Sequence, residues 1–167
     1  MPGIFGAVWG LSGVMILLIS AVYRLSIPAL EIFNYKLLWY QWVILILNVF
    51  FFTFVKGYLG FQRGFSPRVA ARARYLKEHT VFINSILAPL FCMGYFKASR
   101  KRKIIAVSLT TAIIIMIILV RKLPQPWRGI IDFGVIAGLL WGIVSLIVFG
   151  YRAFFKRDFE YSPEVVD

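Results

Sequence analysis

The chain has 167 residues and a net charge of +12, and 60% of its residues are hydrophobic whereas only 16% are charged. Its mean hydropathy is +0.81. A water-soluble domain of this length needs far more polar surface, so the composition excludes an ordinary soluble protein. It indicates a single integral membrane domain over residues 1–167.

Four apolar runs carry no formal charge and approach or reach the length that crosses a bilayer. A hydrocarbon layer of about 30 Å takes roughly 20 helical residues to cross. In chain order the runs are residues 4–23, 37–55, 104–120 and 133–151. The third is the shortest, but Arg121 and Lys122 at its end can snorkel to lengthen it. We therefore predict an all-α protein with four transmembrane helices.

A basic segment lies between the second and third runs. Ser66 and Pro67 are typical of a helix start, with serine as the N-cap and proline in the first turn. Apolar residues then recur on one face, so the pattern predicts a basic interfacial helix over residues 67–79. We expect this helix to contact anionic headgroups. Its membrane-surface cations are Arg68, Arg72, Arg74 and Lys77.

Residues 81–96 form a fifth, shorter apolar segment. A helix of this length reaches only about 24 Å, and Pro89 lies inside it. If the segment spans, the 19 Lys and Arg residues divide ten against nine. If it returns to the side on which it began, they divide 14 against five, as the positive-inside rule expects. We therefore predict a re-entrant or interfacial segment and cytoplasmic termini; a fifth spanning helix is the alternative.

The same segment is the candidate functional part of the chain. Irregular backbone at membrane depth is stable only when protein or trapped water surrounds it. We expect such burial for a set of polar, small and helix-breaking residues, namely Asn84, Ser85, Pro89, Cys92 and Gly94. Cys92 is the only cysteine, which excludes an intrachain disulfide. With no charged leader before the first run, these features favour a bacterial inner membrane location.

Glycines recur at helical spacing in the first and fourth runs. The fourth contains Gly134, Gly138 and Gly142, and the first contains Gly6, Gly10 and Gly13. Small residues in a stripe let helix backbones approach closely, which is how helices associate in lipid. We predict that these glycines form a helix-packing interface, either within the bundle or with another subunit. We also expect the first and fourth helices to pair.

Residues that carry chemistry are scarce. The single histidine, His79, excludes a bis-His haem site within one chain, and none of the seven acids falls in the middle of a predicted span. We predict no metal site and no cofactor, and the basic residues next to membrane entry points do not indicate nucleic acid. Asn48 lies mid-run and is expected to hydrogen-bond to a neighbouring helix.

Three functions fit these features. The first is a non-catalytic integral membrane subunit or assembly factor that packs against another membrane protein through its glycine-lined helices. The alternative is a homo-oligomeric channel or small-solute transporter, because four helices leave little room for a pathway within one chain. The third is a membrane enzyme that acts on lipid or quinone near His79 and Glu78. Partners are then the bilayer and either another membrane protein or a second copy.

Overall fold

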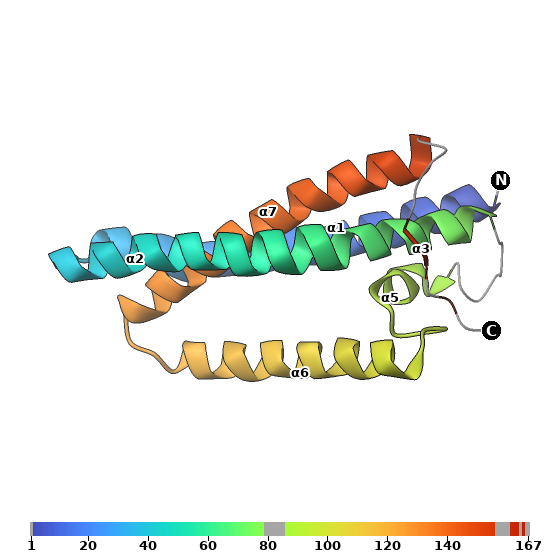
Figure 1. Cartoon of the computed structure of the whole chain (residues 1–167). Helices are drawn as coiled ribbons and strands as arrows, with labels where there is room; N and C mark the ends of the chain where they lie inside the picture. The colour runs from blue at the N-terminus through green and yellow to red at the C-terminus, as the bar shows by residue number, and fades with distance from the viewer. Residues whose placement is uncertain (1, 79–85, 156–160, 164, 166–167) are drawn as a thin grey trace.

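The computed structural model describes residues 2–78, 86–155, 161–163 and 165. Every named element in this part of the chain is a helix (Figure 1). In order they are α1 (Pro2–Leu30), η1 (Glu31–Asn34), α2 (Trp39–Phe51), η2 (Phe52–Phe65), α3 (Ser66–Glu78), α5 (Ala88–Met93), α6 (Arg100–Arg121) and α7 (Trp127–Phe155).

Four continuous helices in the described residues are long and apolar enough to cross a membrane. They are Gly3–Asn34, Trp39–Glu78, Arg100–Arg121 and Trp127–Phe155. The predicted all-helical class and the four helices of spanning length are therefore confirmed. The first helix continues past residue 23, and the second past residue 55, because neither Arg24 nor Lys56 interrupts the helical backbone.

The second of these helices joins α2, η2 and α3 without a break. The prediction that a separate helix starts at Ser66 and Pro67 is wrong, because Ser66 has helical dihedrals and its N–H bonds to the carbonyl of Phe61. Pro67 lacks an N–H, which removes one hydrogen bond from the ladder without ending the helix. Both residues are fully buried at this point of the helix. The apolar face of α3 packs against α1 and α7 instead of facing outward.

Helix α7 is central to the packing. It contacts α1, α2, η2 and α3, and it crosses the other long helices in Figure 1. The expected pairing of the first and fourth helices is confirmed, since α1 and α7 pack along each other and run in opposite directions (Figure 1). The largest buried cluster lies near the N-terminal end of α1, where Val14, Leu76, Phe91 and Leu146 come from four different helices.

Helix α6 stands apart from this bundle. None of its 22 residues is buried, and Figure 1 shows it running alongside the long second helix at a distance. A hydrogen bond between the Tyr95 and Thr110 hydroxyls links it to the preceding turn.

Residues 86–96 contain one short helix rather than a spanning one. Helix α5 has six residues, which reach only about 9 Å, so residues 86–96 do not form a helix of spanning length. Residues 81–85 of the predicted segment lie outside the described residues. Gly94 ends α5 with a φ of +91°, a left-handed conformation that favours glycine. The chain then forms an isolated β-bridge between Ala98 and Val165 before α6 begins. Figure 1 places α5 beside the end of α3 and the start of α6.

This arrangement predicts which polar positions share one side of the membrane. On a Cys92→Ala background, Lys77→Cys and Lys101→Cys should react with an impermeant maleimide from the same side of sealed, oriented vesicles, because residues 86–99, the described part of the chain between α3 and α6, contain no helix of spanning length. Lys36→Cys should react from the opposite side. All three native side chains are exposed, so labelling reports sidedness and not burial. Labelling of positions 77 and 101 from opposite sides would contradict this topology.

Candidate functional site

Arg72 is the buried polar centre of the end of the bundle that holds α5. Its residue is only 4% exposed. Nη1 donates hydrogen bonds to the carbonyls of Phe91 at 2.8 Å and Phe96 at 3.0 Å, and Nη2 donates to the carbonyl of Lys97 at 3.3 Å. The guanidinium carbon also lies 5.0 Å from the centre of the Phe91 ring. Arg72 therefore holds the C-terminal end of α5 and the turn that follows it.

The prediction that Arg72 is a membrane-surface cation is wrong. Because α3 continues the long second helix into the bundle, the side chain of Arg72 points toward α5 and not outward. The last carbonyls of a helix lack intrahelical partners, and a cation with several N–H donors satisfies them. In the sequence Arg72 resembles a ligand for lipid headgroups. In the structure it donates hydrogen bonds to backbone carbonyls.

The other predicted surface cations remain outside the core. Arg68 and Lys77 are exposed. Arg74 Nε bonds to Glu78 one turn later at 3.0 Å, and Lys77 Nζ lies 5.6 Å from the centre of the Phe154 ring. Their binding to anionic headgroups stays a prediction.

Glycines of α1 make room for α5 and α3. A Cβ atom at Gly10 would lie 2.8 Å from Cys92 Sγ, and one at Gly13 would collide with the Pro89 ring. At Gly3 the collision would be with the Lys77 carbonyl oxygen, at 2.6 Å. Gly6 is also buried. Of the α1 glycines expected to form a helix-packing interface, Gly10 and Gly13 therefore receive α5 of the same chain.

The candidate functional segment is only partly described. Asn84, Ser85 and the neighbouring His79 lie outside the described residues. Pro89 is half-buried against α1, and no atom comes within 4 Å of a Cβ at Gly94. Cys92 is buried, and this burial raises the pKa of its thiol to about 12, although the nearby Arg72 charge acts in the opposite direction.

Glycines of α7 pack against the long second helix. A Cβ atom at Gly134 would lie 2.7 Å from the side-chain amide of Asn48. One at Gly138 would lie 3.0 Å from the Phe52 carbonyl oxygen, and one at Gly142 would lie 2.6 Å from the Phe61 ring. The space beside each of the three glycines is therefore filled by a neighbour from the same chain. Two packing roles were expected for this stripe, and the one observed is packing within the bundle.

Asn48 binds across this contact, as expected. Its side-chain amide donates to the carbonyl of Ile130 at 2.6 Å. Further along the same contact, the indole N–H of Trp141 donates to the Gln62 side-chain oxygen at 2.9 Å, and Trp141 packs on Gly57. These two hydrogen bonds join the second helix to α7 at two different positions along the contact.

A polar network at the opposite end of the bundle was not predicted. The Gln125 amide donates to the Pro28 carbonyl and to Glu31 Oε2, each at 3.1 Å, and its oxygen accepts from the Gly129 N–H at 3.1 Å. Arg128 and the buried Asp132 form a longer pair at 3.7 Å. A glutamine in a loop has no helical periodicity, so no sequence pattern indicates this junction between α1 and α7.

In the described ranges, no group of three or more His, Cys, Asp or Glu residues could hold a metal ion. The buried donors and acceptors described above are used to join helices. Comparisons with known protein families, with curated proteins and with solved structures find no match for this chain.

The role of Arg72 can be tested through the reactivity of Cys92. In the wild-type protein, burial and the raised pKa should make maleimide labelling of Cys92 slow at pH 8. Arg72→Met removes three hydrogen bonds that hold the segment after α5, so labelling should accelerate at least about tenfold as the segment opens. Arg68→Met, an exposed change on the same helix, should leave the rate unchanged. Equal rates in the wild type and Arg72→Met would contradict the proposed structural role.

The close contact between α7 and the second helix gives a further prediction. Gly138→Leu should lower the free energy of unfolding in detergent by about 1–3 kcal/mol, because a backbone carbonyl blocks the new side chain. Gly60→Leu is the control, since a Cβ at that exposed position meets only the Val55 carbonyl, at 3.5 Å. Thermal unfolding measures both. If Gly138→Leu were as stable as the wild type, the contact between α7 and the second helix would not be close.

Proposed function

We propose that this chain is an integral membrane subunit, without catalytic chemistry of its own, that packs against another integral membrane protein. The membrane is a bacterial inner membrane, and both termini face the cytoplasm. The exposed basic residues that follow α5 and begin α6, including Lys97, Arg100, Lys101 and Lys103, then lie beside anionic headgroups on the cytoplasmic side.

The observation that carries this proposal is the isolation of α6. This helix is long and apolar enough to span a membrane, yet none of the residues in its apolar stretch is buried in the chain. Helices in lipid associate through close van der Waals packing and hydrogen bonds between helices. α6 obtains almost none of this packing from its own bundle, so its whole length is open to a second protein.

The docking surface differs from the one that the glycine pattern indicated. The glycines of α1 and α7 already receive neighbours from the same chain, so they are not free for a partner. The apolar faces of α6 remain, with Ile114 and Ile118 as typical exposed positions. We therefore assign partner binding to α6 and internal packing to the glycine stripes.

The alternative function is a homo-oligomeric channel or small-solute transporter. The observation that favours it is the presence of exposed cationic side chains on η2, Lys56 and Arg63, within a helix long enough to span. In a closed ring of copies, such side chains line the axis of an anion pathway.

Native mass spectrometry after gentle extraction tests the proposal. We expect the wild-type chain in a complex with a different membrane protein. Ile114→Ala with Ile118→Ala should lower the association constant at least about tenfold, which corresponds to a loss of about 1.4 kcal/mol of packing. The matched control is Ile16→Ala with Ile19→Ala, also exposed and apolar but on α1. Thermal stability should stay unchanged in the α6 variant, because Ile114 and Ile118 are both exposed.

Two results would overturn the proposal. A wild-type chain that is monomeric under conditions that preserve other membrane complexes would exclude a subunit role. A homo-oligomer without another protein would instead favour the channel.

A further inference from the structure

Charged residues occur only at the two ends of α6. Residues 104–120 carry no formal charge, and as a helix they reach about 26 Å, close to the thickness of the hydrocarbon layer. Four consecutive cations, residues 100–103, precede this run and form the first cluster; two more, residues 121–122, follow it and form the second cluster. When α6 spans the membrane, the two clusters therefore lie at its two surfaces.

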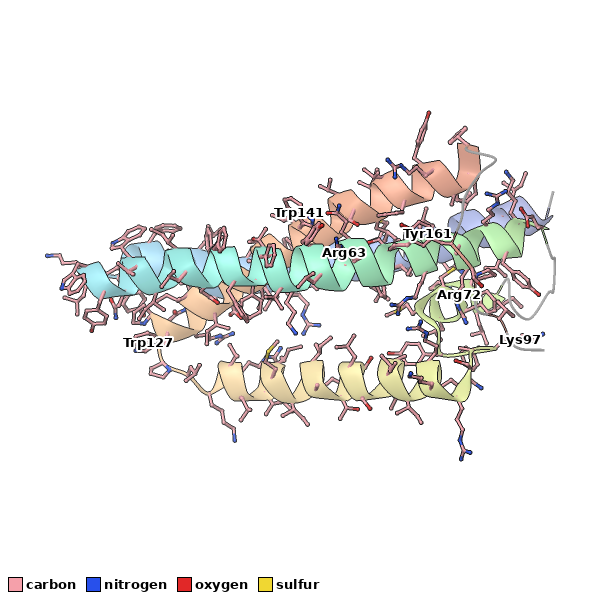
Figure 2. The ribbon with its side chains drawn as sticks, viewed as in Figure 1. Arg63, Arg72, Lys97, Trp127, Trp141 and Tyr161 are labelled. Atoms are coloured by element: carbon pink, nitrogen blue, oxygen red, sulfur yellow. The ribbon has the colours of Figure 1, made fainter. Side chains whose placement is uncertain are left out.

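The first cluster surrounds the beginning of α6. Successive residues of an α-helix point about 100° apart, so four consecutive residues cover its whole circumference. Figure 2 shows the side chains of α6 projecting both toward the bundle and away from it, with Lys97 just before its start and Trp127 beyond its other end. Cations in a first turn also oppose the helix dipole, and the Ser99 side chain does not cap this turn. Anions therefore stabilise the first cluster on every face of the helix.

The surrounding chain supplies no carboxylate for these cations. Residues 79–131 contain no Asp or Glu. The ion pairs between described residues include none of four exposed cations of the two clusters, which are Lys101, Lys103, Arg121 and Lys122. The anions that neutralise these four side chains thus come from outside this part of the chain.

Anionic headgroups meet this need only where α6 faces lipid. On the face where another helix packs, close contact between the two helices excludes lipid. Because the first cluster covers every face, at least one of its cations lies on that packed face, whichever face the partner uses. There the partner itself has to supply the anion.

A second copy of α6 does not supply it. In a parallel pair, the first cluster of one copy would lie beside the first cluster of the other. In an antiparallel pair, it would lie beside the second cluster. Both arrangements place cations next to cations, and like charges across a contact act against the wrong partner.

We propose that α6 binds a transmembrane helix of a different protein, and that Asp or Glu residues flank the apolar span of this helix at the level of the two clusters. This inference rests on the proposed function, because it names the kind of helix that the subunit recognises. The apolar faces of α6 supply the packing, and charge complementarity at the two ends selects the partner.

Synthetic helices test this selection. The probes are three labelled peptides that share one poly-leucine span and carry two Glu, two Gln or two Lys residues at each end. Identical ends make the direction of insertion irrelevant. Energy transfer to the full-length protein, reconstituted in phosphatidylcholine vesicles at pH 8, measures binding. We expect the Glu peptide to bind about tenfold more tightly than the Lys peptide, as a few exposed ion pairs would give, with the Gln peptide between them.

Two variants that each lose four exposed cations assign the preference to α6. The α6 charge variant carries Lys101→Gln, Lys103→Gln, Arg121→Gln and Lys122→Gln. Arg100 and Arg102 are kept so that α6 still inserts in the same direction. The control carries Lys36→Gln, Lys56→Gln, Arg63→Gln and Arg152→Gln. The preference for the Glu peptide should fall to about twofold or less in the α6 charge variant and stay about tenfold in the control, although both have the same net charge.

Three outcomes of these measurements would overturn the inference. The first is that the wild type binds the Glu and Lys peptides equally or does not bind the Glu peptide. The second is a preference that survives unchanged in the α6 charge variant. The third assigns the cations to lipid: the α6 charge variant loses bound phosphatidylglycerol in native mass spectra while the wild type binds the three peptides alike.

Oxidative cross-linking tests the exclusion of a second copy. On a Cys92→Ala background, single cysteines are placed at exposed positions around α6, namely Ile113→Cys, Ile114→Cys, Ile115→Cys and Ile117→Cys. We expect no disulfide-linked dimer in vesicles from any of them. A dimer would show that α6 pairs with itself and would overturn the inference.

Failure of this inference is distinct from failure of the proposed function. A native complex with another membrane protein that persists in the α6 charge variant, but is lost in Ile114→Ala with Ile118→Ala, would keep the subunit role and reject selection by charge.

Discussion

The close approach of α7 to the long second helix is the constraint on which the rest of the structure depends. Three glycines of α7 leave space that Asn48, Phe52 and Phe61 occupy, and these contacts set the register of the two helices. This register sets how far the second helix extends, where α3 enters the bundle and where its side chains point. A helix interface in lipid relies on such dispersion contacts because the hydrophobic effect does not drive it.

The position of α5 follows from that register. Since α3 is carried past the middle of α7, Arg72 arrives inside the bundle next to the carbonyls that end α5. The glycines of α1 provide the opposite wall, against which Pro89 and Cys92 pack. A buried cation, a left-handed turn at Gly94 and two small residues on α1 together hold a six-residue helix that is too short to be stable alone.

Several features were predictable from local patterns. Charge-free runs gave four helices of spanning length, and the imbalance of basic residues argued against a fifth. The hydrogen bond of Asn48 followed from the cost of a polar amide in an apolar helix. The glycine stripes were recognised, but spacing alone does not identify the neighbour that fills a glycine. The glycine stripe of α1 was expected to meet α7, which is wrong. The contact between α1 and α7 instead involves Leu11, Gly129 and Gly150.

The least predictable property was the depth of each helix relative to the others. Hydropathy assigns every apolar run its own membrane centre, and on that basis residues 37–55 and 133–151 lie at one level. The contacts between helices follow a different rule. Lys56 lies against Gly138 because the glycine leaves the backbone of α7 accessible. The level of each run relative to the others is therefore set by contacts between helices, which a hydropathy profile does not contain.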